Sequence, residues 1–176
     1  MKWIKEKIWI VVWSFSLPAT AQTAHVDSDR VVYQNTVRVD HTSQVELFFR
    51  GQKAIATYVT QQPALIKTDA VNHEISGQGI IRLKSPYHLI KDILYTITLS
   101  VTDGAYKYHI DSVYLQEQER GATTKLTSSR ELLKGMDVSG SASWIMEEQL
   151  NEIDMNLQKV IALVKGEMKN ERQKMR

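Results

Sequence analysis

The side chains of this chain best suited to acid–base chemistry are its five histidines. None of them has the HxH, HxxxH or HExxH spacing that brings two histidines to one metal ion. We therefore expect no metal site and no cofactor. His109 and Asp111 stand two residues apart in an alternating segment, so both project from one face of a strand as the candidate acid/base pair. A solvated strand face accounts for the same two residues, and we favour that interpretation.

Motifs for nucleotide binding and nucleophilic catalysis are incomplete. Gly77-Gln-Gly79 begins like a dinucleotide-binding loop, but Arg82 stands where the third glycine is needed. Ser139-Gly140-Ser141 lacks the GxSxG arrangement of a hydrolase nucleophile. The absence of cysteine excludes thiol catalysis, disulfides and a lipidated cysteine. The sequence thus favours a non-enzymatic role, and the alternative is a hydrolase that acts on envelope material through His109 and Asp111.

The first 21 residues read as a secretory signal peptide. Three lysines precede an apolar stretch, Ile8 to Leu17, which Pro18 and Ala19-Thr20-Ala21 follow. This stretch is about half of the roughly 20 residues that span a bilayer. We expect cleavage after Ala21, release into the periplasm or outside the cell without lipidation, and no transmembrane segment in the mature chain. The alternative is an uncleaved anchor.

Charge and length constrain the mature chain further. Of 22 basic and 20 acidic residues, residues 1–21 contain three lysines and Glu6, which leaves 19 of each sign (22 − 3 and 20 − 1). A neutral chain offers no electrostatic argument for nucleic acid, and we expect no such partner. A length of 176 residues suits one domain with its own core.

The first half of the mature chain predicts a strand and a helix after a flexible arm over residues 22–30. Apolar residues alternate from Val31 to Val39, as in a half-buried strand. Ser43 and Glu46 form a capping box, so a helix should begin there and run to about Val59. Apolar residues cover most of its circumference, which predicts that a sheet covers it.

Two further strands are predicted downstream, together with a close approach to the helix. Ala64–Thr68 and Glu74–Lys84 are strand candidates, and the second has Gly77 and Gly79 on its buried side. Because Gly51 lies on the apolar side of the helix, helix and strand should cross near these glycines. A β-bulge at either strand glycine is an equal alternative.

The clearest pattern is a hairpin over residues 95–114. Apolar and polar residues alternate on both sides of Asp103-Gly104, which predicts a type I′ turn or a relative with a G1 bulge. One face of this hairpin should pack against the core and the other should be exposed to water, as in an antiparallel sheet. The exposed rows of Thr and Ser, together with the tyrosines, could form a surface that binds glycan or peptide. The alternative, which we favour, is that the tyrosines belong to the core and have their hydroxyls at the sheet edge. We therefore predict an α+β fold over residues 31–116.

This pattern resembles a known exported family of the Bacteroidetes. The residues that carry the resemblance are Ile75-Ser-Gly-Gln-Gly79 and the segment Tyr95-x-Ile-x-Leu-x-Val-x-Asp103-Gly104-x-Tyr106-x-Tyr108-x-Ile110. The family is known as domain of unknown function forty-four sixty-eight (DUF4468) and has a TBP-like fold. The resemblance covers about Val31 to Tyr114 and implies a fold and an envelope location. It implies neither catalytic residues nor DNA binding.

The last third should begin with a polar linker or wrap over residues 117–143, with a possible short helix at Ser129–Lys134. An amphipathic helix should follow over residues 144–172, with Ser143 as its N-cap. An apolar seam repeats along this helix with spacings of 4, 3, 4, 3 and 4: Met146, Leu150, Ile153, Leu157, Val160 and Val164. Burying six such side chains contributes about 9 to 18 kcal/mol before entropy, so something must cover them. We favour the protein's own sheet, and the alternative is a partner or a second copy.

These observations together predict an exported, non-enzymatic envelope protein. It would bind or scaffold a protein partner, or associate with itself, through its sheet face or its C-terminal helix.

Overall fold

The computed structural model describes residues 25–27, 30–60, 62–84, 89–119, 123–136 and 141–169. The predicted signal peptide, Ser139-Gly140 and the residues after 169 lie outside these ranges. The fold is α+β, as predicted. Its strands are β1 (His25–Asp27), β2 (Arg30–Arg38), β3 (Ile66–Asp69), β4 (Glu74–Arg82), β5 (Leu89–Thr102), β6 (Ala105–Glu119) and β7 (Lys125–Ser128). Its helices are α1 (Gln44–Tyr58), the 3-10 turn η1 (Pro63–Leu65), α2 (Ser129–Met136) and α3 (Ser141–Lys169).

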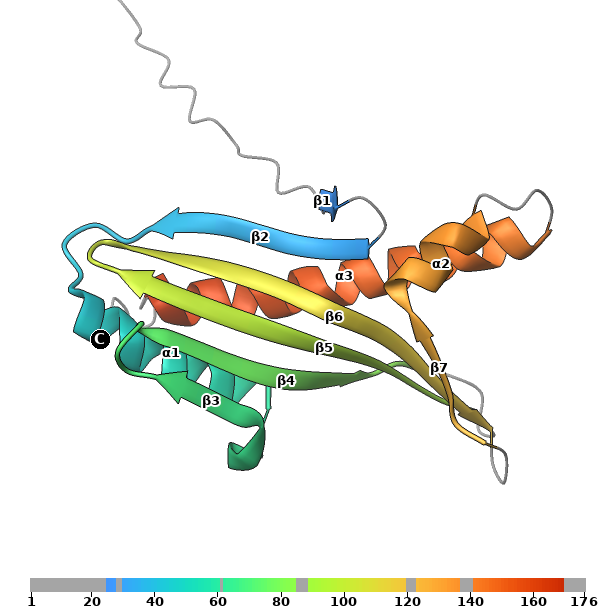
Figure 1. The fold of residues 1–176 in the computed structure, drawn as a ribbon, viewed down its shortest axis with the longest axis horizontal. Coiled ribbons are helices and arrows are strands. Elements are labelled where there is room, and N and C mark those ends of the chain that lie inside the picture. Colours follow the sequence, from blue (N-terminus) through green and yellow to red (C-terminus); the bar gives the residue numbers. More distant parts are fainter. Residues whose placement is uncertain are drawn as a thin grey trace, which may run out of the picture.

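The strands form one antiparallel sheet in the order β1-β2-β6-β5-β4-β3, and β7 pairs with the far end of β6. In Figure 1 the sheet lies in front of α1 and α3, which run behind it along its length. One face of the sheet is therefore covered by helices and the other is open. We call these the helix-covered face and the open face.

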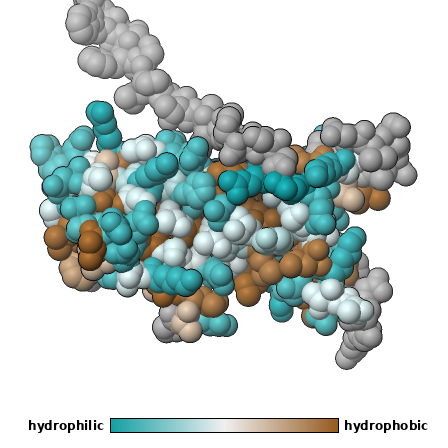
Figure 2. Space-filling model, in the orientation of Figure 1, coloured by the Kyte–Doolittle hydropathy of each residue, from teal (hydrophilic) through white to brown (hydrophobic). Residues whose placement is uncertain are grey.

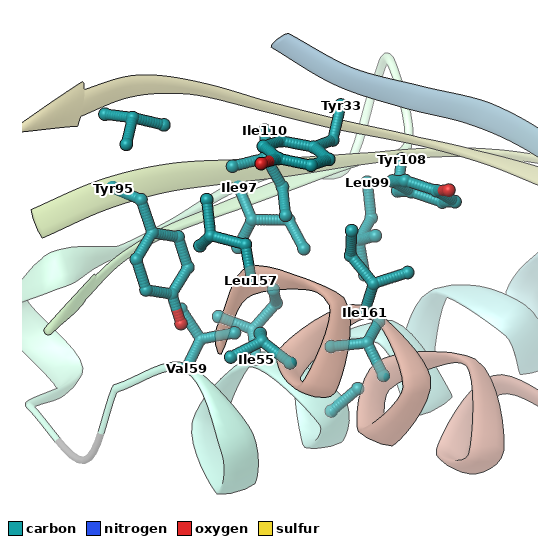
Figure 3. Packing of buried hydrophobic residues seen from close by; sticks show 14 of the residues in the cluster. Tyr33, Ile55, Val59, Tyr95, Ile97, Leu99, Tyr108, Ile110, Leu157 and Ile161 are labelled. Atoms are coloured by element: carbon teal, nitrogen blue, oxygen red, sulfur yellow. The ribbon is translucent and has the colours of Figure 1, made fainter. Parts of the chain in front are cut away.

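The core lies between the sheet and the two long helices. Figure 3 shows Ile97, Leu99 and Ile110 pointing from the strands toward Leu157 and Ile161 of α3, with Ile55 of α1 beside them. Each of these side chains is almost completely buried. Alternation along β5 and β6 produces this arrangement, because every second side chain of a strand points to the same face.

Helix α1 begins where the capping box predicts. The Ser43 hydroxyl accepts a hydrogen bond from the Glu46 backbone N–H at 3.3 Å. The Glu46 carboxylate does not complete the box, because it pairs with Arg50 one turn later. A second cap comes from the hairpin turn, where Asp103 Oδ1 accepts from the Gln44 N–H at 2.8 Å. The turn thus fixes the start of the helix against the end of the sheet.

The predicted close approach of α1 and β4 at glycine residues is confirmed. A Cβ on Gly51 would lie 2.8 Å from Ile75 Cδ1 of β4, and one on Gly77 would lie 2.5 Å from Ile55 Cγ2 of α1. The alternative of a bulge at the strand glycines is wrong, because the β4–β5 register runs unbroken from Glu74 to Arg82. Within the hairpin turn only Gly104 has a positive φ, 68°. A type I′ turn needs two such residues, so this geometry is excluded.

Two boundaries differ from the sequence prediction. The expected flexible arm over residues 22–30 contains β1, which pairs with the first residues of β2. The expected linker over residues 117–143 is largely folded, because β6 continues to Glu119, β7 pairs with it, and α2 buries Leu132 in the core. These elements are short and mostly polar, so composition does not distinguish them from a linker. The predicted short helix at Ser129 is present as α2.

The seam of the C-terminal helix is part of the core, which corrects its assignment as a possible partner-binding surface. Ile153, Leu157, Val160 and Val164 are buried, and Met146 and Leu150 pack half-buried against the core. Helix α3 begins at Ser141, so Ser143 lies inside it and is not its cap.

Polar contacts along α3 hold the helix against the sheet and α1. The Tyr33 hydroxyl donates to Asp154, Lys91 pairs with Glu152 at 2.8 Å, and Lys53 pairs with Glu167 at 2.6 Å. Contacts from strands β2 and β5 and from helix α1 thus fix α3 along its length.

Candidate functional site: the open face of the sheet

The predicted acid/base pair forms on the open face. His109 Nε2 lies 3.3 Å from Asp111 Oδ2, and the two side chains are 34% and 32% exposed. The residues directly across from His109 are Gln34 on β2 and Thr98 on β5. A carboxylate beside an imidazole can orient the ring for proton transfer. The structure therefore brings the two predicted residues together on a strand whose cross-strand neighbours are an amide and a hydroxyl.

A bulge in β6 divides the open face into two regions. Leu94 pairs with Tyr114 and Thr96 pairs with Asp111, so Tyr95 alone faces Ser112 and Val113. Ser112 has φ 51°, the left-handed conformation that the extra residue of a bulge often needs. The bulge reverses the alternation. Before it Tyr106, Tyr108 and Ile110 point to the helices, and after it Val113 and Leu115 do so.

Beyond the bulge an apolar row crosses the open face. Ile80 of β4 is the direct neighbour of Leu94 of β5, which is the direct neighbour of Tyr114 of β6. Leu126 of β7, which pairs with Gln116, adds a fourth apolar side chain. Ile80 is 57% and Leu126 52% exposed. We call these four residues the open-face patch, and Figure 2 shows hydrophobic side chains gathered over this part of the sheet.

The open-face patch lines a hollow with polar borders. The hollow has a volume of about 490 Å³, and its polar lining comes from Gln78, Thr96, Ser112 and Gln116. Next to it Arg82 donates from Nε and Nη2 to the two carboxylate oxygens of Asp92, each at 2.9 Å. These hydrogen bonds raise the pKa of Arg82 further. An apolar centre with a polar rim is the usual anatomy of a protein-binding surface.

Sequence reasoning missed the open-face patch, although a signal was present. Three strands contain apolar doublets at the same level of the sheet: Ile80-Ile81, Ile93-Leu94 and Tyr114-Leu115. In a strand, consecutive residues point to opposite faces, so each doublet places one apolar side chain on each face. Three doublets in register therefore indicate an apolar row on the face that alternation elsewhere keeps polar.

A metal site and a membrane-spanning helix are both absent from the described ranges. No group of three or more His, Cys, Asp or Glu side chains there is arranged to hold a metal ion. In the same ranges, no helix combines the length and the apolar character needed to cross a membrane.

The comparisons with known proteins point to one family and one fold. Residues 33–116 match the family described as a domain of unknown function (DUF4468) with a TBP-like fold. A TBP-like protein from Parabacteroides distasonis has a similar structure, with a TM-score of 0.60, 12% identity, and coverage of 81% of this chain and 97% of its own. A DUF4468 family protein from Bacteroides ovatus gives a TM-score of 0.53 at 12% identity, over 80% of this chain and 90% of its own. No curated protein matches the sequence.

Proposed function

Residues 33–116 of this chain belong to the DUF4468 family and carry its TBP-like fold, and from that premise we propose that the protein is an exported, non-enzymatic binding module of the bacterial envelope. It binds another protein through the open face of its sheet. The binding centre is the open-face patch, and the polar residues around the hollow fix the orientation of the partner.

The observation that carries this proposal is the apolar row itself. Between the bulge and the hairpin turn the open-face side chains are polar, with Thr96, Thr98 and Ser100 on β5 and Lys107, His109 and Asp111 on β6. Large apolar side chains on a solvent-facing sheet surface gain free energy when a partner removes them from water, about 25 cal/mol per Å² of apolar area. Direct cross-strand contact between Ile80, Leu94 and Tyr114 makes this area continuous.

Substitutions on the open face test the binding role. Leu126→Lys and Tyr114→Lys place a charge in the open-face patch, while Thr98→Lys places the same charge on the same face away from it. We expect one envelope protein to co-purify with the wild type and with Thr98→Lys, and to be lost with both patch variants at unchanged circular dichroism. Equal recovery of that protein with all four chains would contradict the proposal.

Export is a separate part of the proposal, supported by the basic and apolar pattern of residues 1–21. Mass spectrometry of the protein from the periplasmic or extracellular fraction should find Gln22 as its first residue and no lipid. A chain that begins at Met1 in the membrane fraction would favour the uncleaved anchor.

Hydrolysis of envelope material is the second candidate, and the 3.3 Å contact between His109 and Asp111 is the observation that favours it. The imidazole of His109 would act as the general base.

A further inference from the structure

One segment of the sheet edge has no strand beside it among the described residues. Strand β3 pairs only with Glu74 to Gly77 of β4, whereas β4 continues to Arg82. Figure 1 shows β4 extending past the end of β3. The five residues Gln78–Arg82, which we call the β4 edge, thus pair with β5 on one side only.

The backbone of the β4 edge points three hydrogen-bonding residues outward. The Leu83 N–H donates to the Lys91 carbonyl of β5 at 2.8 Å. In an antiparallel strand, successive residues direct their N–H and C=O groups to opposite sides. Counting back from Leu83, residues Gln78, Ile80 and Arg82 therefore direct theirs away from β5. The donors and acceptors of Ile80 and Arg82 are in position to pair with an added strand, whereas Gln78 lies opposite Leu65, next to the start of β3.

Space for side chains lies on both sides of this edge. A hollow of about 310 Å³ lies on the α1 side, lined by residues 57–60 and Gln62. The 490 Å³ hollow of the open-face patch lies on the other side. Leu65, Gln78 and Ile80 line both hollows. Side chains of an added strand would alternate between the two.

The opposite edge of the sheet differs in chemistry. Beyond its pairing with β1, the outer edge of β2 carries Gln34, Asn35 and Thr36 and ends at Arg38. Polar and charged residues of this kind discourage strands from pairing with an edge. The β4 edge has Gly79-Ile80-Ile81 at its centre, with Ile80 57% exposed. Of these two edges, β4 is the one suited to accept a strand.

We propose that the β4 edge binds an extended segment of the partner protein, which joins the sheet as an additional antiparallel strand. This inference rests on the proposed function, because the open-face side chains of the added strand would lie on the open-face patch. The segment has a β-branched or aromatic residue opposite Ile80, because cross-strand pairs of such side chains stabilise neighbouring strands. It has an acidic residue toward exposed Lys84, at the end of the edge.

A peptide segment fits this edge better than a second copy of the chain does. Two copies joined through their β4 edges would pair five residues a side, whereas a standard protein–protein interface uses about 20 to 30 residues a side. A bound peptide needs only main-chain hydrogen bonds and pockets for alternate side chains, and this edge offers both.

The first test uses the purified protein to select from a displayed library of random heptapeptides. The best peptide is then synthesised as a series, each member with one N-methylated backbone nitrogen. We expect binding to weaken about tenfold or more at every second position, and to change little at the positions between them, because only alternate N–H groups bond to the edge. Equal effects at all positions, or no selected peptide, would overturn the proposal.

Protein variants test the edge as well, and because Ile80 belongs to both the edge and the open-face patch, the methylation series and Leu126→Lys together separate the two surfaces. Ile80→Lys should weaken peptide binding at least tenfold with unchanged melting, and Thr36→Lys on the β2 edge is the matched control. If Leu126→Lys abolishes capture of the envelope partner while the methylation series is uniform, the proposed function stands and strand addition fails. If neither experiment detects binding, both fail. Sedimentation that shows a dimer dissociated by Ile80→Lys would replace the peptide with a second copy.

Discussion

The ring of Tyr95 occupies the space that a side chain on Gly79 would need. The two residues face each other directly across β4 and β5 on the helix-covered face. A Cβ on Gly79 would overlap the ring at Cζ, Cε1 and the hydroxyl oxygen. Tyr95 is also the residue opposite the β6 bulge. The small residue on one neighbouring strand and the extra residue on the other thus accommodate one large buried side chain.

Gly79→Ala should therefore destabilise the protein by about 1 to 3 kcal/mol, the usual cost of forcing extra atoms into a packed core. Denaturant unfolding measures the loss. Gly166→Ala on α3 is the matched control, because a Cβ there meets nothing within 4 Å, and it should be neutral or stabilise by up to about 1 kcal/mol. Equal effects of the two substitutions would contradict the packing described.

Leu157→Ala should cost about 2 to 5 kcal/mol, because Leu157 is completely buried between α3 and the sheet. Leu163→Ala, at a side chain that is 47% exposed on the same helix, should cost under about 1 kcal/mol. Both free energies come from denaturant unfolding. A Leu157→Ala chain of unchanged stability but altered oligomeric state in sedimentation would restore the partner-binding interpretation of the seam.

Asp103→Ala should destabilise the protein by about 0.5 to 2 kcal/mol, because it removes the acceptor for the first N–H of α1. Asp103→Asn retains an oxygen acceptor and should keep most of the stability. Thermal melting of the three chains provides the comparison. Identical losses for both variants would mean that the charge of Asp103, and not its hydrogen bond, stabilises the helix start.

Alkaline pH should unfold the protein through its buried tyrosines. Burial raises the pKa of Tyr33, Tyr95 and Tyr106 above the ordinary value of 10.0, with Asp154 adding to the rise at Tyr33. Burial also raises the pKa of Tyr108 to about 12. The folded state holds these protons more tightly than the unfolded state does, so their contribution to stability is complete below pH 10 and is lost as pH rises toward 12 and above.

Phenolate absorbance and circular dichroism recorded over the same pH series check this expectation. The four tyrosines should ionise together with loss of secondary structure. Ionisation of all four while the fold persists would show that they are exposed to solvent.

His109→Ala combined with Asp111→Ala should leave melting within about 0.5 kcal/mol of the wild type, since both side chains are about one-third exposed. Binding of the envelope partner should also persist, because neither residue belongs to the open-face patch. The hydrolase interpretation requires a different result, namely loss of a measured hydrolytic activity toward envelope glycan or peptide at unchanged melting.

The elements predicted correctly are those with strong local signals. Ser43 and Glu46 placed the start of α1 because a cap is a contact within one turn of helix. Tyr95 to Val101 indicated β5 because alternation needs no knowledge of distant residues. The glycines of α1 and β4 indicated their crossing, since a missing side chain marks a close approach of two backbones.

The elements missed depend on contacts between distant residues. Strand β7 is four residues long and pairs with the end of β6. In the sequence, the bulge at Ser112 appears only as one break in the alternation of apolar and polar residues. The end of a strand produces the same break. Of the candidate site, His109 and Asp111 were predicted as neighbours, whereas the open-face patch required the register of four strands.

The amino-acid sequence alone determined the α+β class, the antiparallel hairpin and the amphipathic character of α3, because periodicity is a property of consecutive residues. Only the tertiary structure decided that the seam of α3 packs on its own sheet, that Ile80, Leu94 and Tyr114 form one row, and that β4 extends beyond β3. Each of these depends on the register and length of strands far apart in the chain, and a one-residue change of register would move every side chain to the other face.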